Sequence, residues 1–341
     1  MKPGPLKPAV VKPGRAGNAG IVASFAIALA GVVLGAVSAY FSEYGAGARA
    51  ARVEALAAAS TDGAPFDQVR AERDKAIQRV LTDGALERLP VPSRAETAAP
   101  DAPRPKVIII LDDMGLDPRA AERIMNLPGP LTLSFLPYAR DVDVLAGRAR
   151  AAGNEIMLHL PMEPQGDNDP GPNALKLGMT GAEFIKNLDW NLSRFDGYDG
   201  VNNHMGSRLT TDRAAMKTVL AYLRHKDLFF IDSVTTGDTI VREAGADVGA
   251  QVFERDVFLD AETGSVEAVK AQLQLVERIA LETGYAVAIG HPHETTINAL
   301  GPWLTSAPAR GFEIAPVSAL VEIYGAERGE SVLAAAPALR L

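Results

Sequence analysis

The chain has 341 residues, of which 47% are hydrophobic and 22% charged, which suits a large folded domain and excludes a mainly disordered protein. It contains no cysteine, so disulfides, cysteine-ligated metals and thiol nucleophiles are excluded, and any metal ligands must be His, Asp or Glu. The net charge of −8 leads us to expect no nucleic-acid partner.

The first 42 residues combine a basic cytoplasmic tail, 1–18, with an apolar segment, 19–42, and no charged residue follows Arg15 until Glu43. The apolar segment is long enough to cross a hydrocarbon layer of about 30 Å as one helix. By the positive-inside rule we predict an inner-membrane anchor that places the rest of the chain in the periplasm. Two alternatives stay open: a signal peptide cleaved near residue 39, which also exports the chain, and a buried soluble helix.

Residues 43–105 are rich in alanine and proline, which favours an extended tether between the membrane and the next domain. A short helix is expected near 67–82. We predict that a fragment starting near Pro103 folds without the tether and the anchor. At the other end of the chain, residues 325–341 are expected to form a flexible tail.

The region from 106 to 324 alternates short apolar runs with amphipathic stretches. Predicted strands lie at 107–111, 131–135, 155–159, 229–231, 252–253 and 286–289. Predicted helices lie at 118–125, 142–152, 181–193, 212–225 and 265–282. This alternation is typical of a parallel sheet covered by helices and predicts one barrel-like α/β domain. An open, doubly wound sheet is the alternative.

Polar residues follow several of these strands, and the carboxyl ends of parallel strands open onto one face of the sheet. An Asp pair is often only a helix cap, and a single strand-end His is often structural. The convergence of four of the five histidines and an Asp pair favours a site, whereas His225 fits a charged helix end. The residues that meet there are Asp112, Asp113, His159, Glu163, His204, Asp232, Arg255, Asp256, Asp260, His291 and His293.

A carboxylate and two neutral imidazoles leave open coordination positions on a divalent ion, as a hydrolytic metal site requires. Water bound there reaches a pKa of about 7, a nearby carboxylate takes its proton, and a histidine protonates the leaving amine. Asp112 or Asp113, together with His159, His204 and His291, fill these roles.

Six short motifs, in this order, resemble the divergent polysaccharide deacetylase family over residues 107–322. They are Ile-Ile-Leu-Asp-Asp-Met-Gly, Met-Leu-His-Leu-Pro-Met-Glu-Pro, Asn-Asn-His-Met-Gly-Ser, Phe-Ile-Asp-Ser, Arg-Asp-Val-Phe-Leu-Asp and Ile-Gly-His-Pro-His. The resemblance implies a deformed (β/α) barrel related to the NodB-type carbohydrate deacetylases, a zinc-like divalent metal and export to the cell envelope.

The resemblance also implies individual roles: Asp112 as base, Asp113 as metal ligand and His291 as acid. NodB-type enzymes carry two ligand histidines four residues apart, but Glu163 stands at that distance from His159. We therefore expect His204 to complete the ligand set, with Glu163 as the alternative.

Supporting roles are expected for His293 beside the acid and for Asp232. The usual Arg-x-Pro-Tyr motif is not evident. Arg255 and Asp256 are expected either to orient the acid or base or to pair with each other.

The sequence thus predicts a zinc-dependent hydrolase that removes N-acetyl groups from an envelope glycan. Two alternatives remain open. One is a non-catalytic glycan-binding or regulatory module that keeps the fold, and the other is a metal-independent glycoside hydrolase using Asp112 and Asp260.

Overall fold

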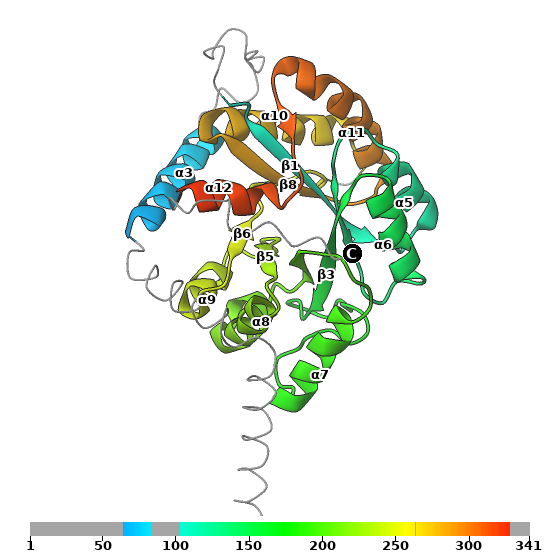
Figure 1. The fold of residues 1–341 in the computed structure, drawn as a ribbon, viewed down its shortest axis with the longest axis vertical. Coiled ribbons are helices and arrows are strands. Elements are labelled where there is room, and N and C mark those ends of the chain that lie inside the picture. Colours follow the sequence, from blue (N-terminus) through cyan, green and yellow to red (C-terminus); the bar gives the residue numbers. More distant parts are fainter. Residues whose placement is uncertain (1–63, 83–102, 263, 328–341) are drawn as a thin grey trace, which may run out of the picture. The chain divides into compact units, whose positions relative to one another are not determined.

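A curled, parallel β-sheet lies at the centre of the computed structural model, which describes residues 64–82, 103–262 and 264–327 (Figure 1). Along this sheet the strands follow the order β6-β5-β4-β3-β2-β1-β8-β7, with β9 beside β1, and the pairings are parallel. The strands are β1 (Lys106–Met114), β2 (Thr132–Phe135), β3 (Glu155–Met162), β4 (Gly200–Met205), β5 (Phe229–Asp232), β6 (Val252–Glu254), β7 (Val257–Phe258), β8 (Tyr285–Gly290) and β9 (Glu313–Ile314).

The strand order is that of a barrel. From β7 through β8 and β1 to β6 the order never reverses, which excludes the doubly wound alternative, where the order reverses at a switch point. In the described part of the chain, the hydrogen-bonded ladder ends at β6 and β7 without joining them. Arg255 and Asp256 alone separate these two strands in the sequence. The prediction of a parallel α/β sheet of barrel type is confirmed.

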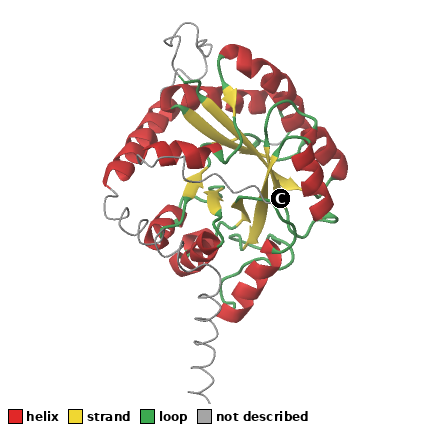
Figure 2. Ribbon diagram, viewed as in Figure 1, coloured by secondary structure: helices red, strands yellow, loops and turns green. Residues whose placement is uncertain are grey.

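Helices surround the strands (Figure 2). Several begin where a side chain accepts hydrogen bonds from the first turn: Asp117, Thr180, Asp212 and Ser265 cap α5, α7, α8 and α10. The described helices are α3 (Ala64–Thr82), α5 (Pro118–Met125), α6 (Val142–Ala151), α7 (Gly181–Leu192), η3 (Leu209–Thr211), α8 (Arg213–His225), α9 (Val241–Val248), α10 (Val266–Thr283), α11 (Glu294–Ser306), η4 (Ala307–Arg310) and α12 (Ala319–Glu327).

Both faces of the sheet are buried, and alternate residues serve different cores. On β1, Val107, Ile109 and Leu111 pack in the larger core with the outer helices, whereas Ile108 and Ile110 face the inside of the curl. The inner core also contains Met157 of β3, Ile231 of β5, Ile289 of β8 and Leu320 of α12. Because side chains alternate between the two faces of each strand, every second residue points into the curl, including polar residues at the strand ends.

The predicted tether contains a helix that packs on the domain. α3 contacts α10, and Ile77 belongs to the larger core (Figure 1). The Arg73 guanidinium donates two hydrogen bonds to the Asp256 carboxylate, of 3.1 and 2.8 Å, and lies 4.0 Å from the centroid of the Tyr285 ring. Residues 64–82 therefore belong to the same compact unit as the domain, rather than to an extended spacer.

Removing Arg73 should destabilise this unit. The side chains of Arg73 and Asp256 are only 14% and 5% exposed, so Arg73→Ala leaves a buried carboxylate without its cation. We expect the free energy of unfolding to fall by about 3 kcal/mol, measured by urea denaturation of the chain including α3. The control Lys75→Ala breaks a pair that is about 70% exposed on the same helix and should change this free energy by less than about 1 kcal/mol. Equal stability of Arg73→Ala and the parent would show that α3 is not part of the folded unit.

The predicted membrane anchor, 19–42, lies outside the described residues, as does most of the predicted tail. Within the described residues, 64–82, 103–262 and 264–327, no helix is both long enough and apolar enough to span a bilayer.

Candidate metal centre

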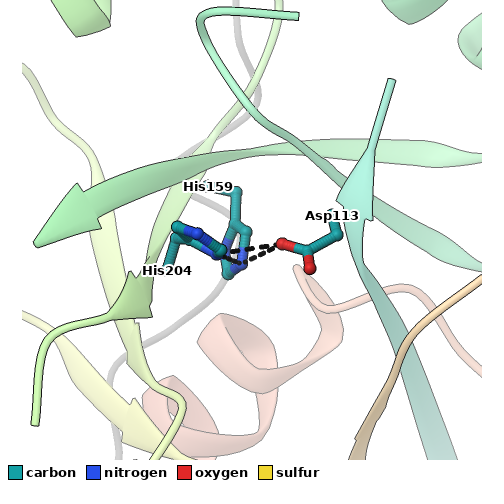
Figure 3. Close-up of side chains that lie close together, drawn as sticks. All are labelled: Asp113, His159 and His204. Atoms are coloured by element: carbon teal, nitrogen blue, oxygen red, sulfur yellow. Dashed lines mark hydrogen bonds and ion pairs between the residues drawn. The ribbon is translucent and has the colours of Figure 1, made fainter. Parts of the chain in front are cut away.

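Three side chains from three strands of the sheet, β1, β3 and β4, point at one another near the carboxyl ends of these strands (Figure 3). Oδ1 of Asp113, from β1, lies 2.9 Å from Nδ1 of His204 on β4 and 3.3 Å from Nε2 of His159 on β3. The two imidazole nitrogens are 3.3 Å apart. Asp113, His159 and His204 thus offer one oxygen and two nitrogen atoms in a compact triangle.

The backbone explains how Asp113 reaches this triangle. Asp112 continues the inward series of Ile108 and Ile110, so a regular strand would direct Asp113 to the opposite face. The register of β1 shifts after Leu111, and Asp113 adopts the left-handed conformation with φ of 55°. Aspartate tolerates this conformation better than most residues, and such backbone irregularities gather at functional sites. The turn directs both carboxylates of the pair into one site.

A divalent cation fits the triangle. Oδ1 of Asp113 is buried without a hydrogen-bond partner, although it faces two ring nitrogens. Zinc–ligand bonds of about 2.0–2.1 Å at tetrahedral angles place donor atoms about 3.4 Å apart, close to the separations observed here. One carboxylate and two imidazoles are also the donors expected for zinc at a catalytic site, with a position left open.

The electrostatics of the site favour positive charge between these atoms. Burial would lower the pKa of His159, but the charges of Asp112 and Asp113 outweigh this effect and raise it. Burial would raise the pKa of Asp113, but the two imidazoles hold it well below its usual range. The negative potential that favours a proton on His159 favours a divalent cation in the same place.

Asp112 lies beside the triangle without belonging to it. Its Oδ2 is 3.7 Å from Nε2 of His159, and its side chain is almost fully buried. Burial raises the pKa of Asp112. A buried carboxylate whose pKa is raised is a stronger proton acceptor than an ordinary aspartate.

His291 lies on the opposite side, at the end of β8. Its Nε2 is 4.0 Å from Oδ2 of Asp113, and its Nδ1 is 3.0 Å from Oδ1 of Asp260. Burial lowers the pKa of His291, but the hydrogen bond to Asp260 and the nearby Asp112 and Asp113 outweigh it and raise the pKa to about 9. The ring of His293 stacks on the ring of His291, with 5.6 Å between the ring centroids.

Other predicted site residues support the loops instead of entering the triangle. Glu163 pairs with Arg208 at 3.0 Å and accepts a hydrogen bond from the Leu177 amide. Asp232 accepts hydrogen bonds from the Val234 amide and the Thr239 hydroxyl. These contacts fix the segments that follow β3 and β5.

Arg255 and Asp256 do not pair with each other. Arg255 donates hydrogen bonds to the carbonyls of Ser233 and Val234, and Val234 has an unusual positive φ of 49°. Asp256 binds Arg73 and accepts a hydrogen bond from the Val287 amide. Arg255 therefore holds a strained loop beside the site, whereas Asp256 anchors α3.

The sequence motifs assigned Asp260 only to the glycoside-hydrolase alternative and assigned no role to Asn202. Asp260 holds His291, and Asn202 contacts both His159 and Asp112, at 2.8 and 2.7 Å. The signal for Asn202 was its position two residues before His204 on a strand, which places both side chains on the same face.

Comparisons with known proteins identify the family to which this chain is similar. A family model described as divergent polysaccharide deacetylase matches residues 109–321. The uncharacterized protein YibQ of Escherichia coli is 30% identical over 203 residues, which cover 60% of this chain and 63% of YibQ, less than two thirds of that relative. An uncharacterized Haemophilus influenzae protein is also 30% identical over 203 residues, covering 60% of this chain and 72% of its own.

Among solved structures, an uncharacterized protein from Agrobacterium tumefaciens C58 has a similar fold. The TM-score is 0.62 at 28% sequence identity, and the match covers 67% of this chain and 92% of the other. The matched family region contains every residue of the metal triangle together with Asp112 and His291.

Proposed function

The chain belongs to the divergent polysaccharide deacetylase family, and on this premise we propose that it is a metal-dependent hydrolase removing N-acetyl groups from an envelope polysaccharide. The proposal depends above all on one observation. A ligand triangle of Asp113, His159 and His204 lies between a carboxylate outside the ligand set, Asp112, and a histidine held by a carboxylate, His291. These are the groups that water-mediated amide cleavage requires.

Asp113, His159 and His204 would hold the cation, which when bound makes water a nucleophile near neutral pH and polarises the amide carbonyl. Asp112 accepts the proton that water loses as its oxygen bonds to the carbonyl carbon. His291 donates a proton to the amide nitrogen as the carbon–nitrogen bond breaks, so that acetate and a free amine leave. The hydrogen bond to Asp260 raises the pKa of His291 and so favours the protonated ring that an acid needs.

The proposed place of the reaction is the cell envelope. The basic tail and the apolar segment 19–42 support an inner-membrane anchor with the domain in the periplasm. Membrane fractionation tests this part separately. Release of the protein by high salt, or a mature amino terminus near Tyr40, would contradict a retained anchor.

The activity is tested by incubating the purified protein with N-acetylated chito-oligosaccharides and with envelope glycan. We expect acetate to appear in proportion to new free amines, without new reducing ends. Reducing ends without acetate would indicate a glycoside hydrolase, and glycan binding without either product would indicate a binding module.

The structure argues against the carboxylate pair Asp112 and Asp260 as a glycoside hydrolase. Both oxygens of Asp260 are engaged, by Nδ1 and the amide of His291 and by the Thr296 hydroxyl. Asp260 is also buried. Its geometry is that of a residue that orients His291.

Replacing Asp260 should move the pH range of activity. Asp260→Asn removes the negative charge that raises the pKa of His291, so His291 loses its proton at lower pH. We expect the upper limit of the profile of kcat/KM against pH to move to lower pH. A bound cation lowers this pKa in parent and variant alike, so the comparison between them keeps its direction.

Thr296→Val provides the matched control for Asp260→Asn. It removes a hydrogen bond to the same carboxylate but leaves its charge, so it should not lower the upper limit. Identical limits in the parent and Asp260→Asn would show that His291 is not the acid, or that Asp260 does not tune it.

A further inference from the structure

The side chain of Asn202 connects the ligand His159 to the base Asp112. Asn202 is fully buried on β4 and lies opposite His159 in the ladder between β3 and β4. Its Oδ1 is 2.8 Å from Nδ1 of His159 and 2.5 Å from Oγ of Ser134. Its Nδ2 is 2.7 Å from Oδ1 of Asp112 and 3.2 Å from Oγ of Ser233. All four hydrogen-bonding positions of the amide are therefore occupied.

The neighbours of Asn202 determine which way its amide points. The Asp112 carboxylate can only accept hydrogen bonds when ionised, so the Asn202 NH₂ group must face it. The carbonyl oxygen of the amide must then face His159. Because this oxygen only accepts hydrogen bonds, Nδ1 of His159 must carry a proton. Nε2 of His159, the atom that faces Asp113 and His204, is left with its lone pair for a cation.

We propose that Asn202 is a positioning residue that sets two groups at once. Its carbonyl oxygen fixes the tautomer and the ring orientation of the metal ligand His159. Its NH₂ group holds Oδ1 of Asp112, which leaves Oδ2 directed at the metal triangle. The role of Asp112 as base rests on the proposed function, whereas the effect on His159 concerns metal binding alone.

The isosteric variant Asn202→Asp separates the two roles. It keeps an oxygen that accepts from Nδ1 of His159, but it replaces the donor to Asp112 with an oxygen. We expect the zinc dissociation constant, measured by competition with a chelator, to stay within about tenfold of the parent. For acetate release, kcat should fall by at least about 100-fold, whereas KM should stay within about threefold.

Asn202→Leu removes both contacts. We expect zinc affinity to fall by about 10–100-fold, the effect of losing the partner of a ligand histidine, and kcat to fall as well. Asn203→Ala is the matched control. Asn203 is the next residue of β4, is equally buried, and contacts the Met205 carbonyl and the Ser233 amide instead of the site groups. Its zinc affinity and kcat should stay within about threefold of the parent at zinc saturation.

Several outcomes would overturn the proposal. Parental zinc affinity in Asn202→Leu would refute the role toward His159, and parental kcat in Asn202→Asp would refute the role toward Asp112. Equal losses in Asn203→Ala would show that the effects come from general loosening of β4. If Asn202→Leu does not fold, loss of zinc by Asn202→Asp refutes the first role instead. If the parent releases no acetate from any glycan, the proposed function fails, while the zinc measurements still decide the role toward His159.

Discussion

Asp112→Asn is expected to slow acetate release by about 10²–10⁴-fold while leaving the zinc content of the protein unchanged. Asp112 lies beside the triangle and contacts Asn202, so its replacement deletes the step that takes a proton from water without removing a ligand. Metal content is measured by elemental analysis and turnover by acetate release. His291→Ala should behave in the same way, because the acid also lies outside the ligand set.

Asp117→Asn is the matched control for Asp112→Asn. Asp117 lies five residues after Asp112, beyond the end of β1, where it caps α5, and asparagine caps helices equally well. This control should keep parental turnover. Near-parental turnover of Asp112→Asn across the pH range would show that Asp112 is not the base.

His204→Ala is expected to lose zinc and turnover together. His204 supplies one of the three donor atoms of the triangle, and Nδ1 lies 2.9 Å from Oδ1 of Asp113. Loss of a residue that only hydrogen-bonds to a metal ligand lowers metal affinity by roughly 10–100-fold, so loss of the ligand itself should lower zinc affinity by more than that. Acidification should weaken zinc binding to the parent, because histidine ligands must lose their protons to bind metal.

Glu163→Gln tests the alternative ligand set. Glu163 is four residues from His159 but pairs with Arg208, so this variant should keep its zinc. Full zinc occupancy in His204→Ala, together with loss of zinc in Glu163→Gln, would reverse the assignment.

Much of the fold could be predicted because the chain alternates clear strand and helix patterns. The six predicted strands correspond to β1, β2, β3, β5, β6 and β8, and the five predicted helices to α5, α6, α7, α8 and α10. β4 was not predicted as a strand, because three of its six residues are the consecutive polar Asn202, Asn203 and His204. β7 and β9 have only two residues each, too few to show a periodic pattern. α11 was not predicted, and a proline, Pro302, lies inside it.

The position of α3 could not be predicted from local sequence. The helix forms near the expected residues, but its attachment depends on Arg73 and Asp256, which are 183 positions apart. Ion pairs over such separations leave no periodic signal in the sequence. The expected fragment starting at Pro103 would omit α3 and leave Asp256 without Arg73.

The site was predicted in its residue types but not in its contacts. The strand-end positions of Asp112, His159, His204 and His291 identify the face where they meet. The left-handed turn at Asp113 depends on a register shift in β1, which no motif specifies. Asn202 is uncharged and is not a typical zinc ligand, so a search for charged or metal-binding residues does not identify it.

The most direct test of a metal-dependent deacetylase measures acetate release by the chelator-treated protein before and after zinc is added back. N-acetylated chito-oligosaccharides and envelope glycan serve as substrates. We predict no release from the zinc-free protein, recovery of release with about one equivalent of zinc, and no recovery in Asp113→Ala, which lacks the ligand oxygen. Acetate release that is equally fast with and without zinc would contradict the central claim.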